Sequence, residues 1–93
     1  MQIREIIKNK QGTIIDVRNQ GELLDGFIPG SVNIPVTEIP YRVEEIKKMQ
    51  GPLVLYCRSG SRSSMAMMML QSAGVSTEMH NGGGYFDMLQ YIN

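Results

Sequence analysis

Two short runs of apolar residues predict buried strands. Residues 13–17 are rich in β-branched side chains, and residues 53–57 are almost wholly apolar. Neither Ile14-Ile15 nor Leu53-Val54-Leu55 alternates between apolar and polar positions. This is the pattern of parallel strands buried on both faces. We therefore expect parallel strands at 13–17 and 53–57, with further strands at 31–34 and 76–80.

Four other stretches carry apolar residues at the spacing of an amphipathic helix. Glycine, alone or with proline, closes the first three of them, as is common at helix ends. Residues 18–30 lack such spacing and predict a loop with one helical turn near Glu22, and residues 81–84 predict a turn. The expected helices are marked by Ile3, Ile6 and Ile7 (ending at Gly12), by Ile39, Val43, Ile46 and Met49 (ending at Gly51-Pro52), by residues 63–73 (ending at Gly74), and by Tyr85, Phe86, Leu89 and Ile92.

Strands that alternate with helices indicate an α/β fold with a mainly parallel sheet and helices on both faces. The 93 residues contain no repeat, low-complexity tract or linker, and they suffice for one core. We expect a single domain over residues 1–93. In parallel sheets of this kind, ligands bind beyond the carboxyl ends of the strands, and Cys57 lies at one such end.

Charge and composition exclude several classes of function. Nine basic and nine acidic side chains cancel, so no net field favours nucleic acid or an anionic membrane. One cysteine excludes an internal disulfide and a redox pair, and one cysteine with one histidine cannot build a Cys/His zinc site. We expect no metal and no cofactor. The first ten residues lack the apolar core of a signal peptide, and no interface stripe is evident, so a cytoplasmic monomer is the expectation.

The candidate site is the loop after Cys57. A thiol at the end of a strand that faces a helix start lies among unpaired N–H groups, at the positive end of the helix dipole. Hydrogen bonds from one or two of these groups suffice to hold a thiolate at neutral pH. A lone cysteine is more often a small buried hydrophobe. The combination with the loop favours an accessible nucleophile in an anion-binding cradle.

The composition of the loop supports that interpretation. A cation in the first turn of a helix is unfavourable by about 0.3–1 kcal/mol, yet Arg58 and Arg62 both flank this turn. Locally unfavourable choices tend to mark functional sites. Gly60 allows the backbone to turn its N–H groups inward, and Ser59, Ser61 and Ser63 are small enough to leave space. These residues predict a site for a small oxyanion or a sulfur anion.

The loop Cys57-Arg58-Ser59-Gly60-Ser61-Arg62-Ser63 resembles the active-site loop of the rhodanese family of sulfurtransferases, in its single-domain form. Three further segments resemble motifs of that family in the family's order: Asp16-Val17-Arg18 with Glu22, residues 26–35, and Gly83-Gly84. The family usually has His where this chain has Phe27, and Trp where Met88 stands.

The resemblance implies a three-layer rhodanese-like fold and a persulfide mechanism. Cys57 would take a sulfane sulfur from thiosulfate or a persulfide donor and pass it to an external thiol or to cyanide. The N–H groups of residues 58–63 would hold the terminal sulfur. From charge and position, we expect Arg58 and Arg62 to bind the anionic end of the donor.

Asp16, Arg18 and Glu22 are interpreted as supporting residues. We expect Arg18 to pair with the carboxylates near the strand end and to fix the loop beside Cys57.

Two other functions stay open on sequence alone. A cysteine phosphatase also places a thiolate and an arginine around a loop of N–H groups. Its pattern resembles a cysteine, five residues and then an arginine, whereas only four residues separate Cys57 from Arg62 here. A persulfide relay that serves a protein acceptor, or a redox-sensing thiol, would need the same loop as the enzyme.

Overall fold

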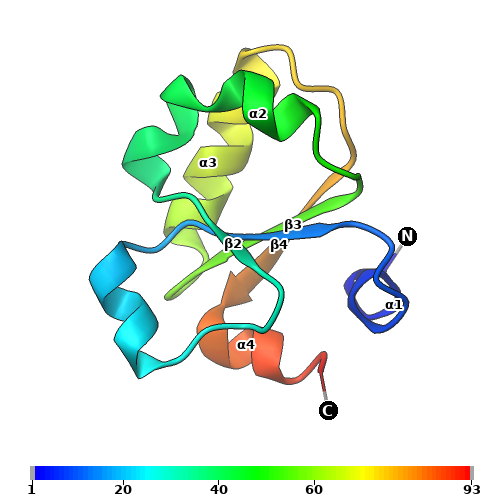
Figure 1. Ribbon diagram of the computed structural model, residues 1–93, viewed down its shortest axis with the longest axis vertical. Coiled ribbons are helices and arrows are strands. Elements are labelled where there is room, and N and C mark those ends of the chain that lie inside the picture. Colours follow the sequence, from blue (N-terminus) through cyan, green and yellow to red (C-terminus); the bar gives the residue numbers. More distant parts are fainter. Residues whose placement is uncertain (1, 93) are drawn as a thin grey trace.

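The computed structural model describes residues 2–92, and its centre is a sheet of four parallel strands (Figure 1). The strands are β1 (Thr13–Asp16), β2 (Val32–Asn33), β3 (Leu53–Cys57) and β4 (Met79–Gly84). They lie in the order β2-β1-β3-β4, so the two apolar runs, predicted as parallel strands, form the centre of the sheet.

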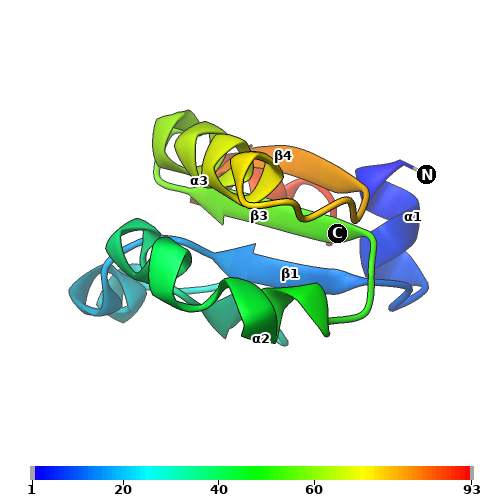
Figure 2. The same ribbon diagram turned by 90° about the horizontal axis from the view of Figure 1, so that it is seen from above.

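Helices cover both faces of this sheet, which confirms the predicted three-layer α/β architecture (Figures 1 and 2). One face is covered by the 3₁₀ helix η2 (Val36–Tyr41), α2 (Val43–Lys47) and α3 (Ser61–Ser72). The other is covered by α1 (Ile3–Lys8) and α4 (Tyr85–Leu89). A second 3₁₀ helix, η1 (Gln20–Asp25), provides the predicted helical turn around Glu22.

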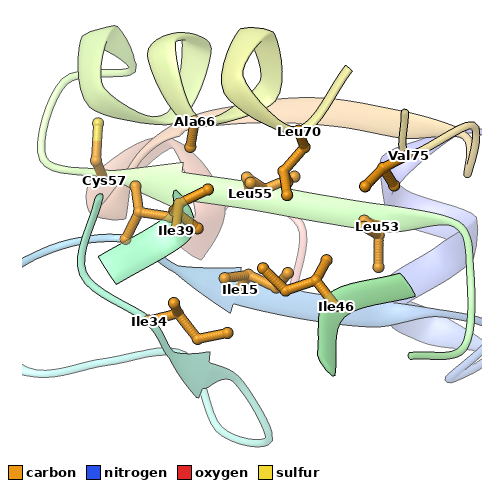
Figure 3. Packing of buried hydrophobic residues seen from close by; sticks show 11 residues of the cluster. Ile15, Ile34, Ile39, Ile46, Leu53, Leu55, Cys57, Ala66, Leu70 and Val75 are labelled. Carbon is orange, nitrogen blue, oxygen red and sulfur yellow. The ribbon is translucent and has the colours of Figure 1, made fainter. Parts of the chain in front are cut away.

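Strand β3 is buried along its whole length and contributes to two cores. Leu53, Leu55 and Cys57 pack beneath α2 and α3, whereas Val54 and Tyr56 pack against α1 and α4. The alternation follows from the two-residue period of a strand. It points the Cys57 side chain to the α3 side, where Figure 3 shows the sulfur directed toward that helix.

The helix predicted from Ile39 to Met49 is divided in two. A 3₁₀ helix that contains Pro40 precedes α2, because proline has no N–H to donate within a continuous helix. The predicted apolar face is present, since Ile39 and Ile46 are buried and Val43 and Met49 are partly buried against the same core. Helix α3 begins at Ser61, before the predicted residue 63, and α4 ends at Leu89.

The last predicted strand is present, but its bounds and the turn predicted after it were wrong. The sequence predicted a strand at 76–80 and a turn at 81–84, but Met79–Gly84 is one strand. Its glycines hide it from pattern analysis, yet they permit close packing: a Cβ on Gly84 would collide with the carbonyl oxygen of Arg58. None of the helices in residues 2–92 has the length and apolar character needed to cross a membrane.

Candidate active site

The site forms where the carboxyl ends of β1 and β3 meet. Cys57 is the last residue of β3, and α3 begins only four residues later, at Ser61. Gly60 closes this short connection with a left-handed backbone, φ 99°, which a residue with a side chain rarely adopts. The loop therefore folds back over the end of the strand.

The amide groups of the loop act on the sulfur, as predicted. The N–H of Gly60 donates a hydrogen bond to Sγ of Cys57 at 2.9 Å, and the hydroxyl of Ser63 lies 3.6 Å from Sγ. Burial raises the pKa of Cys57, but the Ser63 hydroxyl and the N–H groups of Ser63, Ser59 and Gly60 outweigh it. The net effect places the pKa of the thiol below its ordinary value, which favours a thiolate.

The expectation that this sulfur is accessible was wrong. Cys57 is 0% exposed and belongs to the core cluster that contains Ile39 and Ala66 (Figure 3). The cause is the fold of the loop, because Gly60 carries its N–H back across the sulfur. The thiol thus has the electrostatic environment of a nucleophile but is covered.

Asn81 in β4 holds this loop in place, a role the sequence analysis missed. Its amide group donates to the carbonyl of Gly60 at 3.0 Å, and its Oδ1 accepts the Ser63 hydroxyl at 2.7 Å and the Gly83 N–H at 2.9 Å. The Ser63 hydroxyl has one proton, so Oδ1 of Asn81 and the carbonyl of Gly60, 3.1 Å away, compete with the Cys57 thiolate for it. The only signal in the sequence was a polar residue near the end of a strand, and it was missed because residues 81–84 were predicted to be a turn.

Arg62 is paired with Glu22 within the protein, a contact that the sequence did not predict, and its role in binding a donor stays a prediction. Its guanidinium donates to both carboxylate oxygens of Glu22, at 2.6 and 2.9 Å. The hydrogen bonds from Arg62 lower the pKa of Glu22 to about 2. Arg62 also lies close enough to Cys57 for the thiolate to raise the pKa of the guanidinium, although Glu22 contributes more.

Arg18 makes one of its predicted pairings, the ion pair with Asp16. It forms an ion pair with Asp16 at 2.8 Å, and both side chains are buried. It also donates to the carbonyl of Gly26 and packs over the rings of Tyr56 and Tyr85, 5.4 and 4.9 Å from their centroids. The predicted pairing with the Glu22 carboxylate was wrong, because Arg18 reaches only the main-chain carbonyl of that residue, at 3.5 Å.

Arg58 lies at the surface beside a cavity of about 400 Å³. Within residues 2–92 its guanidinium has no ion-pair partner. Ser59 and Ser61 are also exposed, with hydroxyl oxygens 3.4 Å apart. The cavity is lined by Arg18, Glu22, Asp25, Arg58, Tyr85 and Phe86.

Comparison with known families shows to which family the chain belongs. The family model of the rhodanese-like domain matches residues 2–90, almost the whole chain. The chain belongs to the rhodanese-like domain family. Its solved relatives share the fold: the human single-domain sulfurtransferase TSTD1 superposes with a TM-score of 0.77 at 25% identity, over 95% of this chain and 89% of that one.

Curated relatives of this rhodanese-like domain carry sulfurtransferase names. A sulfurtransferase of Allochromatium vinosum is 37% identical over 71 residues, which cover 76% of this chain and 65% of that protein. The thiosulfate sulfurtransferase/rhodanese-like domain-containing protein 3 of Mus musculus is 31% identical over 103 residues, which cover 97% of this chain and 66% of that protein. The chain thus spans just under two thirds of the length of both relatives.

Proposed function

We propose that this rhodanese-like domain is a sulfurtransferase in which Cys57 carries the sulfur as a persulfide. The observation that carries the proposal is the hydrogen bond from the Gly60 N–H to Sγ at 2.9 Å, together with the hydroxyl of Ser63 at 3.6 Å. These donors stabilise negative charge on a sulfur atom without a general base. The sulfurtransferase names of its relatives support the same function.

The loading step begins with the Cys57 thiolate. Its lone pair attacks the outer sulfur of a sulfane donor such as thiosulfate, forming a new S–S bond. The S–S bond of the donor breaks, and sulfite leaves with the electron pair. The transferred sulfur then carries the negative charge, and the loop N–H groups that acted on the thiolate are the donors nearest to it.

The unloading step needs a thiol from outside, because Cys57 is the only cysteine in the chain. An external thiolate attacks the outer sulfur of the persulfide, forms its own persulfide and restores the Cys57 thiolate. Cyanide in an assay would take the same sulfur as thiocyanate. The acceptor is a small thiol or a cysteine of a partner protein.

Movement of the loop is part of this proposal. Cys57 has no exposed surface, so a donor reaches Sγ only if residues 58–60 move away from it. The side chains of Arg58 and Ser59 are exposed and do not anchor that segment in the core. Gly60 is held by a hydrogen bond from the Asn81 amide to its carbonyl at 3.0 Å and by the bond from its own N–H to Sγ at 2.9 Å.

Intact-mass spectrometry tests the proposed function. The protein is incubated with thiosulfate and, separately, with an organic persulfide, and then with excess thiol. We expect one added sulfur atom that maps to Cys57 and is lost on addition of the thiol. Cys57→Ser is the control and gains no sulfur. Failure of both donors to load the wild-type protein, or equal loading of the Ser variant, would refute the proposal.

A further inference from the structure

Asn81 of β4 faces the loop over Cys57, next to a bulge in the strand. Asn81 lies opposite Leu55, and the pairing of β4 with β3 then skips Gly82, which marks the bulge. Side chains that lie opposite each other point to the same face of a sheet, and Leu55 packs beneath α3. Asn81 therefore lies on the face to which the Cys57 sulfur points (Figure 3).

The hydrogen bonds of Asn81 fix the orientation of its amide. The carbonyl of Gly60 can only accept a hydrogen bond, and it receives one from Nδ2 of Asn81 at 3.0 Å. The main-chain N–H of Gly83 can only donate, and Oδ1 of Asn81 accepts it at 2.9 Å. The side chain thus connects β4 to the loop, and its donor group faces the loop.

This hydrogen bond ties residues 58–60 to another part of the chain. Within residues 2–92, Asn81 is the one side chain from outside residues 57–64 that hydrogen-bonds to them. The other bonds of Gly60 join it to Cys57 and to the first turn of α3, which are its neighbours in the chain. Asn81 is exposed, so water can replace its bond to Gly60 when the loop moves away.

We propose that Asn81 is a positioning residue that holds residues 58–60 closed over Cys57, and that local breaking of its bond to Gly60 gives reagents access to the sulfur. The inference rests on the proposed function and names how access to its site is controlled. Opening moves the Gly60 N–H away from Sγ, so the movement that uncovers the sulfur also removes one of its donors. The closed loop is the state that stabilises the sulfur, and the open loop is the state in which it reacts.

Thiol labelling measures this opening without any sulfur transfer. The Cys57 thiolate displaces iodide from iodoacetamide, and the sulfur must be uncovered to react. Rates are compared at a pH above the inflection of the rate profile, where the thiol is ionised in every variant. They are measured at several low urea concentrations, because opening of three residues exposes little surface and global unfolding exposes much.

Asn33 of β2 provides a matched control. Its amide also donates to main-chain carbonyls, those of Asp16 and Arg18, at 2.9 Å each. Asn33→Ala therefore removes hydrogen bonds from the sheet without removing one from the loop. Asn81→Ala removes the bond to Gly60, and Asn81→Asp keeps the accepting oxygen but loses the donating group.

We expect labelling of the wild type to be independent of urea at low concentrations. Asn81→Ala and Asn81→Asp should each raise this urea-independent rate constant by roughly two- to tenfold, the effect of one neutral hydrogen bond. Asn33→Ala should leave it unchanged and lower only the urea concentration at which the whole fold unfolds. If a variant fails to fold, the wild type still decides: hydrogen exchange of the Gly60 N–H should give the same opening constant as Cys57 labelling, because one movement frees both groups.

The inference is overturned if either Asn81 variant is labelled at the wild-type rate, or if Asn33→Ala raises the urea-independent rate as much as they do. It is also overturned if labelling or Gly60 exchange in the wild type follows global unfolding at every urea concentration.

Loading by thiosulfate and by an organic persulfide tests the proposed function separately in the same samples. Loading of the wild type, combined with wild-type labelling of the Asn81 variants, would remove the role of Asn81 and leave the proposed function intact. Loading by neither donor, with labelling as expected, would remove the proposed function and still support the closed loop.

Discussion

The ion pair between Glu22 and Arg62 makes a prediction about acid stability. Its two hydrogen bonds, at 2.6 and 2.9 Å, lower the pKa of Glu22 from 4.5 to about 2. Because the folded protein holds this carboxylate ionised more strongly than the unfolded chain does, the pair stabilises the fold fully above pH 4.5. That stabilisation is lost as the pH falls from 4.5 toward about 2.

The size of the effect follows from the same pKa values. A fall from 4.5 to about 2 corresponds to roughly 3 kcal/mol, at 1.36 kcal/mol for each tenfold change in acidity. This is an upper limit, since about a quarter of each side chain is exposed and solvent screens the pair. We therefore expect Glu22→Gln to lower the free energy of unfolding by about 1–2 kcal/mol at neutral pH.

Urea unfolding of the wild type and of Glu22→Gln at neutral pH and near pH 2.5 measures this effect. The difference in free energy of unfolding between the two proteins should fall below about 0.5 kcal/mol at the lower pH, because Glu22 is then largely protonated in the unfolded chain and the ion pair stabilises the fold little. Glu44→Gln, which removes a largely exposed carboxylate, controls for the general effect of losing one charge. A Glu22→Gln difference that is the same at both pH values would refute the reasoning.

Three further variants test the site and its support. Ser63→Ala removes a hydroxyl 3.6 Å from Sγ, so we expect a higher pKa of Cys57, seen as a shift of the loading pH profile to higher pH; an unshifted profile would contradict this role. Tyr56→Phe removes a hydroxyl that donates to Asp16 at 2.7 Å and accepts a main-chain N–H at 3.1 Å, so we expect the free energy of unfolding in urea to fall by about 2–4 kcal/mol. A fall of less than about 0.5 kcal/mol would show that these hydrogen bonds are dispensable. Gly60→Ala places a side chain at φ 99°, so we expect the free energy of unfolding to fall by about 1–2 kcal/mol and Cys57 to take up sulfur more slowly. Wild-type values of both quantities would mean that the loop does not need this conformation.

The elements of the fold that could be predicted are those that residues close together in the sequence determine. The two central strands are uninterrupted apolar runs, and the strand, turn and helix around Cys57 follow one another in the chain. The ion pair of Arg18 with Asp16 joins residues two positions apart, so it was within reach of local reasoning. Strand β4 was misplaced because its polar and glycine residues carry no apolar period, and its position is set by backbone pairing with β3.

The errors at the site come from contacts between distant segments. Glu22 and Arg62 are 40 residues apart, and nothing in either local pattern shows that they meet. Asn81 reaches Gly60 and Ser63 from another strand for the same reason. The burial of Cys57 depends on where the loop folds, and residue types alone do not determine that.

The central claim is that the loop holds the Cys57 sulfur as a thiolate. The most direct measurement is the ultraviolet absorbance of the thiolate across a pH titration, taken as the difference between the wild type and Cys57→Ser so that tyrosine contributions cancel. We expect an inflection clearly below the value of about 8.5 for a free cysteine. An inflection at or above that value would contradict it, because burial would then outweigh the hydrogen bonds from Gly60 and Ser63.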